Sequence, residues 1–297
     1  MADGWTVELA RLRDALRAEL FKVVRRRMTY ICLAAFSALV VLFYVILWLR
    51  IREGPGTSPQ TLLTWLAVRS AMSFANVVPY SLALERFFAT LVCAIFAGTV
   101  MGNEFDWRTV GVVTGRGVRR WHFLFAKTVV SLVFTVVTLL LGLFIALAIS
   151  AWFTSVYDLP WGDAGPERYI DAVLSMGRTL YTIFPFVFMA LLFATLWRSG
   201  GLAVGAALGA FFIEGIFIGL LSAASGWPRL VPNFFLSINI DAVLRANGTF
   251  GGGDGNVPFA LGEAGPPEWR GAMVLGAWSL AIVLVSFWVF LRRDIQE

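Results

Sequence analysis

Six apolar blocks, each about 20 residues long, limit what this chain can fold into. They cover residues 29–49, 82–102, 128–152, 179–197, 201–222 and 271–291. An α-helix rises 1.5 Å per residue, so about 20 residues cross the roughly 30 Å hydrocarbon core of a bilayer. Lipid offers no hydrogen-bond partner to an exposed peptide group, and the blocks lack the alternation of barrel strands. The sequence therefore predicts an all-α integral membrane protein with six transmembrane helices.

The basic residues predict how these helices are oriented. An even number of spans places both termini on one side, and the segments on that side carry fifteen of the 24 Lys and Arg residues. Basic residues accumulate on the cytoplasmic side of membrane proteins. We therefore expect a multi-pass protein of a bacterial cytoplasmic (inner) membrane, with its N- and C-termini in the cytoplasm. The sequence pI of about 9.6 then reflects topology, and we expect no nucleic-acid partner.

Residues 1–28 are expected to form a cytoplasmic amphipathic connecting helix ahead of a transmembrane domain over residues 29–297. Apolar residues recur there at spacings of three and four, at Leu9, Leu12, Leu16, Leu20 and Val23. A helix with such a stripe and basic flanks lies along the membrane surface. The alternative is a positively charged anchor for the first span.

The external segment before the last span covers residues 223–270. Its apolar-periodic part, residues 234–244, predicts a short re-entrant or external helix. The glycine run at residues 251–255 predicts a flexible loop after it.

Residues 103–127, here called the elbow, join the second and third spans on the basic side. Acidic residues begin the elbow and basic residues end it: Glu104, Asp106, Arg116, Arg119 and Arg120. Negative charge is favoured at a helix N-terminus and positive charge at its C-terminus. Glycines interrupt the segment, so a short helix and a turn are expected.

The sequence contains none of the motifs that would indicate catalysis or metal binding. It has no GxxxxGK[ST] phosphate-binding loop, no HExxH and no GxSxG. Cys32 and Cys93 have no metal-site spacing and are expected to be packing residues, and His122 is the single histidine. We expect a protein that is not an enzyme, with no catalytic residue, no metal and no cofactor of its own.

The elbow resembles the signature that follows the second span in the permeases of type-2 ABC exporters, E-[YF]-x-x-G-T…L…[PG]-V-[ST]-R…K. The matching positions are Glu104 to Thr109, Val112 and Val113, Gly117 to Arg119, and Lys127. The segment Phe290 to Ile295 resembles the C-terminus of the same family. Two positions depart from the signature. Arg108 stands where the family usually has glycine, and Arg120 adds a second basic residue.

The resemblance implies a function for the whole chain. In that family the elbow is the coupling helix, which docks on a separate ATPase subunit that binds ATP and Mg. The chain would then be the permease subunit of an exporter, assembled with two ATPase subunits and with a second permease copy or a related permease in the lipid bilayer. The residues implied in ATPase coupling are Glu104, Asp106, Arg108, Thr109, Arg116, Arg119 and Arg120.

The fifth span carries a face of small residues at Gly201, Gly205 and Gly209, which predicts close packing against another helix, in the same chain or across a dimer. On this basis Gly205 should tolerate a leucine less well than Gly142, an isolated glycine in the third span.

Glu214 follows in the same span. A carboxylate in hydrocarbon costs on the order of 2.5–3.5 kcal/mol, so it is expected to face a transport path or to bond a neighbouring span. The resemblance favours the path, with Phe211 and Phe217 beside it. The surrounding apolar residues suggest an amphipathic or lipid-like substrate.

An alternative function is a stand-alone ion-coupled secondary transporter that uses Glu214. Such proteins show paired broken helices and several buried charges. The sequence offers Glu214 as the single candidate of this kind.

Overall fold

The computed structural model describes residues 2–115, 119–162, 165–223, 227–247 and 266–292. The described residues are helical with short connections, and the elements are α1 (Ala2–Arg25), α2 (Arg27–Arg52), α3 (Pro59–Ala71), α4 (Val77–Asp106), α5 (Thr109–Gly115), α6 (Arg120–Val156), α7 (Pro166–Trp197), α8 (Gly200–Ser222), η1 (Trp227–Phe234), α9 (Leu236–Leu244), η2 (Arg245–Asn247) and α10 (Glu268–Arg292).

Six of these helices are long and apolar enough to cross a membrane: α2, α4, α6, α7, α8 and α10. Each contains one of the six predicted apolar blocks, so the prediction of an all-α fold with six helices able to span a membrane is confirmed for the described residues. The helices extend beyond the blocks, and α6 is the longest at 37 residues. At the two ends of the bundle, the short helices α3 and α5 pack against α2 and α4, respectively.

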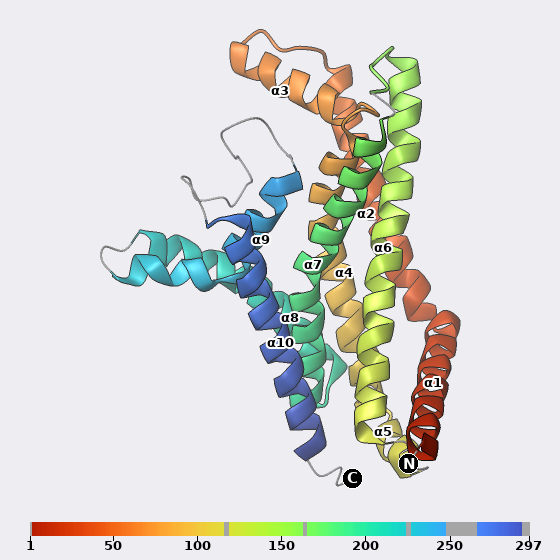
Figure 1. Ribbon diagram of the computed structural model, residues 1–297. Helices are drawn as coiled ribbons and strands as arrows, with labels where there is room; N and C mark the ends of the chain where they lie inside the picture. Colours follow the sequence, from red (N-terminus) through yellow and green to blue (C-terminus); the bar gives the residue numbers. More distant parts are fainter. Residues whose placement is uncertain (1, 116–118, 163–164, 224–226, 248–265, 293–297) are drawn as a thin grey trace.

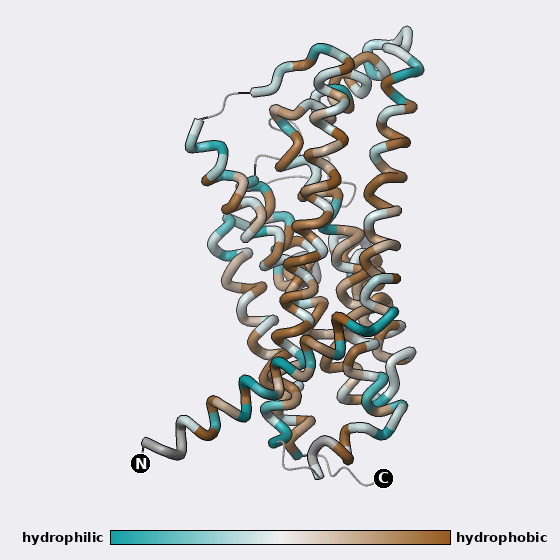
Figure 2. Tube along the Cα trace, turned by 90° about the vertical axis from the view of Figure 1, so that its right-hand side faces the viewer, coloured by the Kyte–Doolittle hydropathy of each residue, from teal (hydrophilic) through white to brown (hydrophobic). Residues whose placement is uncertain are grey.

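The two ends of the bundle differ (Figure 1). The elbow end carries α5, the first residues of α1 and the last residues of α10, whereas α3 lies across the opposite end, here called the α3 end. Figure 2 shows α1 leaving the bundle obliquely at the elbow end. Both ends of the described chain therefore lie at the elbow end, as an even number of spans requires.

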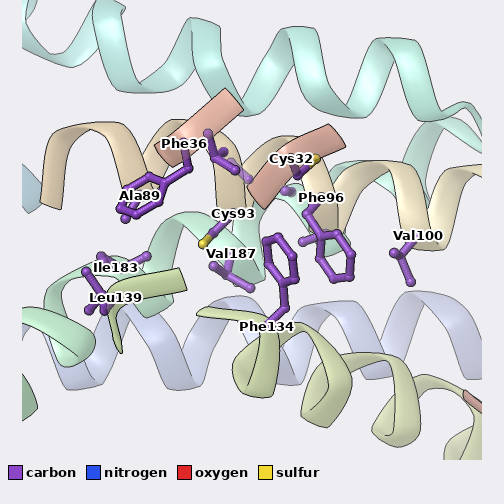
Figure 3. Packing of buried hydrophobic residues seen from close by; sticks show 14 of the residues in the cluster. Cys32, Phe36, Ala89, Cys93, Phe96, Val100, Phe134, Leu139, Ile183 and Val187 are labelled. Atoms are coloured by element: carbon purple, nitrogen blue, oxygen red, sulfur yellow. The ribbon is translucent and has the colours of Figure 1, made fainter. Parts of the chain in front are cut away.

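Helix α4 is the centre of the bundle, because α2, α6, α7 and α8 all pack against it. Much of its core is apolar, and Phe96 stacks on Phe134 of α6 with ring centroids 3.7 Å apart. Figure 3 shows this core, which includes Cys32 and Cys93. Both cysteines are buried and free, in agreement with their interpretation as packing residues.

The first half of helix α8 packs closely against α4. A Cβ added to Gly102 of α4 would lie 2.1 Å from the Cα of Gly200, and one added to Gly98 would lie 3.0 Å from Val204. Farther along, large side chains such as Ile216 and Leu220 are more than 60% exposed. Toward its carboxyl end α8 extends sideways from the bundle together with η1 (Figure 1).

The predicted helix at residues 234–244 is present as α9. It packs against α10, where the carbonyl oxygen of Asn239 would lie 2.8 Å from a Cβ on Gly271. The glycine-rich loop predicted at residues 251–255 lies outside the described residues.

Candidate functional site at the elbow

Five charged side chains meet at the elbow end of the bundle, and we call them the charge network: Glu19, Lys22, Arg26, Glu104 and Lys127. Glu104 Oε1 lies 2.8 Å from Lys127 Nζ and 2.9 Å from Arg26 Nη2. Lys127 Nζ also lies 2.6 Å from Glu19 Oε2. The network therefore joins α1, α4, α6 and the link between α1 and α2.

Glu104 also holds the beginning of the elbow helix. Thr109, the first residue of α5, donates its hydroxyl to the Glu104 carboxylate and contacts the Glu104 carbonyl oxygen at 3.2 Å. The sequence placed Glu104 and Asp106 at the start of a helix, but they lie in the last turn of α4. Glu104 is only 1% exposed, so its carboxylate links helices inside the protein and is not a surface charge.

Burial makes Glu19, Glu104 and Lys127 depend on their partners in the network. Lys127 is fully buried and Glu19 is 4% exposed. Ions removed from water need opposite charges nearby, and removing one partner from a buried pair costs about 3–5 kcal/mol. The network therefore fixes the position of α1 relative to α4 and α6.

A second contact links α1 to the end of the elbow. Glu8 lies 2.9 Å from Arg119 Nη2 and 3.4 Å from His122 Nε2, at the start of α6. Arg120 donates to the carbonyl oxygen of Leu291 in α10, at 3.5 Å. Of the four basic residues predicted for coupling, Arg119 and Arg120 thus bind other helices of this chain. Arg116 lies outside the described residues.

Two other predicted coupling residues, Asp106 and Arg108, are exposed, as are Trp107, Val112 and Arg119, and we call these five residues the elbow surface. Trp107 is 61% exposed and Val112 is 52% exposed, so the patch combines apolar area with charges of both signs. Asp106 Oδ2 also accepts from the N–H of Gly200 at 3.4 Å. Large exposed aromatic and aliphatic side chains beside charges are typical of surfaces that bind another protein.

The backbone of Arg108 is unusual. Its φ is 52°, in the left-handed region that favours glycine. The conformation follows from the end of α4, where the N–H of Arg108 donates to the carbonyl oxygen of Phe105 at 3.0 Å. This is the position at which the resembling permeases usually have glycine.

The residues predicted for a transport path are not brought together. Phe211 packs between Phe87 of α4 and Phe186 of α7, with centroids 5.8 and 5.2 Å away. Phe217 is 51% exposed on the outside of α8. Glu214 accepts hydrogen bonds from Ser237 of α9, from the hydroxyl at 2.8 Å and from the N–H at 3.2 Å.

The glycine face of α8 has no partner in the described chain. A Cβ added to Gly201, Gly205 or Gly209 would meet nothing within 4 Å. The small residues that pack against other helices are Gly200, Ala203 and Ala207, on another side of α8. The sequence left open whether this face packs within one chain or across a dimer. Among the described residues it makes no contact within the chain.

Three further charged residues, which the sequence analysis did not select, lie within the bundle. Glu85 and Arg86 belong to α4, and Arg86 interacts electrostatically with Asp241 of α9. Burial raises the pKa of Asp241, whereas Arg86 and Arg245 act to lower it. The sequence signal for these residues was the pair of adjacent charges inside the apolar block 82–102. The expectation that Glu214 is the single buried charge is therefore wrong.

A comparison with curated proteins found no match. A family model described as "Protein of unknown function (DUF2705)" matches residues 67–296, from α3 through α10, and so includes the elbow, Glu85 and Glu214. Because the match covers well over half of the sequence, the chain belongs to the DUF2705 family.

Proposed function

We propose that this chain is the transmembrane permease subunit of an ATP-binding-cassette exporter. It would move an amphipathic or lipid-like substrate outward, driven by a separate ATPase subunit that docks on residues 103–127. The observation that carries the proposal is the construction of the elbow, with a buried charge network behind it and an exposed apolar and charged surface in front.

The two layers of the elbow suit the transmission of force. A partner that pushes on Val112 pushes on α5, and α5 is held to α4 through the contact between Thr109 and Glu104. Trp107 lies at the end of α4 itself. Glu104 in turn is bound to Lys127 of α6 and Arg26 ahead of α2. Movement of the elbow would therefore be delivered to three of the six candidate spans at once.

Two further observations support the same function. The conformation of Arg108 reproduces what a glycine at that position of the resembling permeases would allow. The unpartnered Gly201, Gly205 and Gly209 face leaves room for a second permease copy. The ATPases would lie in the cytoplasm of a bacterial cell, with the elbow end facing them.

The test is to purify the chain together with the products of neighbouring genes and to measure ATP hydrolysis. We expect an ATPase to co-purify and the chain alone to hydrolyse no ATP. Replacing Val112 with Asp on the elbow surface should reduce co-purification, whereas Arg50→Glu at the α3 end, which is similarly exposed, should not. Robust hydrolysis by the pure chain, or full ATPase binding by the Val112→Asp variant, would contradict the proposal.

The second candidate, a stand-alone ion-coupled secondary transporter, gains support from one finding. Glu85, Arg86, Asp241 and Glu214 place several ionisable groups between the helices, as such transporters require. Transport into vesicles that is driven by an ion gradient without ATP, and lost in Glu214→Gln, would favour this function over the exporter.

A further inference from the structure

Glu85 of α4 is a fully buried carboxyl group without a partner in the described chain. Its exposed fraction is 0%, and neither carboxyl oxygen has a hydrogen-bond partner among the described residues. The carboxyl fills the space beside Gly142 of α6, where an added Cβ would lie 2.6 Å from both Glu85 Cδ and Oε2. The same Cβ would lie 2.9 Å from Phe36 of α2, so the site is enclosed by three helices.

The position of the site along α6 places it deep in the apolar part of the bundle. Gly142 follows Lys127 of the charge network by 15 residues and precedes Trp152 by 10 residues. At 1.5 Å per residue these separations correspond to about 22 Å and about 15 Å. Tryptophan rings prefer the headgroup layer, so Glu85 lies well inside the hydrocarbon region.

The charged and titratable groups around Glu85 do not neutralise it. Arg86 follows in the sequence but interacts with Asp241 of α9. Tyr44 of α2 is a titratable group that interacts electrostatically with Glu85, but a tyrosine carries no positive charge. No side chain in the described parts of α6, α7 and α8 donates a hydrogen bond to Glu85.

We propose that Glu85 is an intramembrane proton-binding site, occupied as a neutral carboxylic acid when α2, α4 and α6 are packed together. An ionised carboxylate held there without water or a cation would cost several kcal/mol, whereas the acid form carries no net charge. Release of the proton then requires water to reach the group, which means separation of α2 or α6 from α4. Proton binding at Glu85 and closure of this three-helix contact are therefore linked, whichever energy source drives the protein.

A hydrophobic carbodiimide provides a direct chemical probe. The carboxylic acid adds across one C=N bond of dicyclohexylcarbodiimide: its proton goes to nitrogen and its oxygen bonds to the central carbon, forming an O-acylisourea. Migration of the acyl group from oxygen to nitrogen gives a stable N-acylurea without a leaving group. The reaction needs the protonated acid, so mass spectrometry of the labelled chain reports the protonation of Glu85.

The experiment uses the full chain in phosphatidylcholine vesicles over a range of pH. We expect an adduct on Glu85 that decreases as the pH rises, no adduct at that position in Glu85→Gln, and no labelling of Glu104, which is buried but paired with cations. A water-soluble carbodiimide should leave Glu85 unmodified.

Infrared spectroscopy tests the same claim without requiring the reagent to enter. The carbonyl stretch of a protonated carboxylic acid should be present at neutral pH and should be lost in Glu85→Gln. Because the amide imitates the neutral acid, this variant should retain the thermal stability of the natural chain. Absence of that band at neutral pH, or marked destabilisation by Glu85→Gln, would overturn the proposal; neither result would affect the assignment of the elbow as an ATPase-docking site.

Discussion

The carboxyl group of Glu85 on α4 occupies the space that a side chain on Gly142 of α6 would need. A Cβ at Gly142 would approach Glu85 to 2.6 Å and Phe36 to 2.9 Å, whereas one at Gly205 of α8 would meet nothing within 4 Å. Glycine spacing predicted that Gly205 would tolerate a larger residue less well than Gly142. Within the described chain the contacts indicate the opposite order.

Gly142→Ala should therefore lower the stability of the isolated chain by about 1–3 kcal/mol, as expected for overpacking of a tight core. Thermal unfolding in detergent micelles measures the effect. Gly205→Ala is the matched control and should unfold at the same temperature as the natural chain. If the glycine face of α8 contacts a second permease, Gly205→Leu will instead reduce the oligomer in size-exclusion chromatography.

The approach of α4 to α8 gives a second pair of variants. A Cβ on Gly102 would lie 2.1 Å from the backbone of Gly200, and backbone atoms cannot rotate away as a side chain can. We expect Gly102→Ala to destabilise the chain more than Gly142→Ala, because two helices must separate. Gly201→Ala, one residue from Gly200, meets nothing within 4 Å and should be neutral in the same unfolding measurement.

Lys127 should be the residue of the charge network whose loss is most damaging. Lys127→Met leaves Glu19 and Glu104 with one fewer cation in a buried site, at an expected cost of about 3–5 kcal/mol. The double variant with Glu104→Gln should lose less than the sum of the two single changes, with a coupling of about 0.5–3 kcal/mol. Additive losses would show that the two side chains do not interact.

Arg108 allows the backbone and the charge to be tested separately. Arg108→Gly should stabilise the chain by up to about 1 kcal/mol by removing the strain of a left-handed conformation, whereas Arg108→Ala keeps the strain. Both variants remove the charge from the elbow surface. Equal loss of ATPase binding in the two, with stability raised only in the glycine variant, would assign the docking contribution to the guanidinium group.

Glu214 should tolerate an isosteric amide better than an apolar residue. Glu214→Leu leaves the hydroxyl and N–H of Ser237 without their acceptor, at a cost of about 1–3 kcal/mol, and should expose α9 to limited proteolysis. Glu214→Gln keeps an acceptor oxygen and should preserve α9. Transport lost in Glu214→Gln without any change in proteolysis would show that the charge itself acts in transport.

The number and position of the spans could be predicted because length and apolarity are local properties of the chain. The same holds for α1 and α9, each marked by its own periodicity. The partners of individual residues could not be predicted in this way. The resemblance implied a docking role for Glu104, and nothing local in the sequence marks its buried contacts with Lys127 and Arg26. Glu85 and Arg86 were visible as charges inside an apolar block. Only the packing of α2, α6 and α9 distinguishes the acid without a hydrogen-bond partner from the arginine that interacts electrostatically with Asp241.

The charge network also orders the biogenesis of the protein. Glu19 of α1 leaves the ribosome about 100 residues before its partner Lys127, and Glu104 is made only shortly before Lys127. Until the third span is inserted, Glu19 of α1 lacks its contact with Lys127, although Leu9, Phe21 and Val24 remain on the exposed side of α1 to hold it at the lipid surface. The first helix to be synthesised is thus held in place only after α6 has been made, so the elbow is anchored only in chains whose first three spans have been inserted.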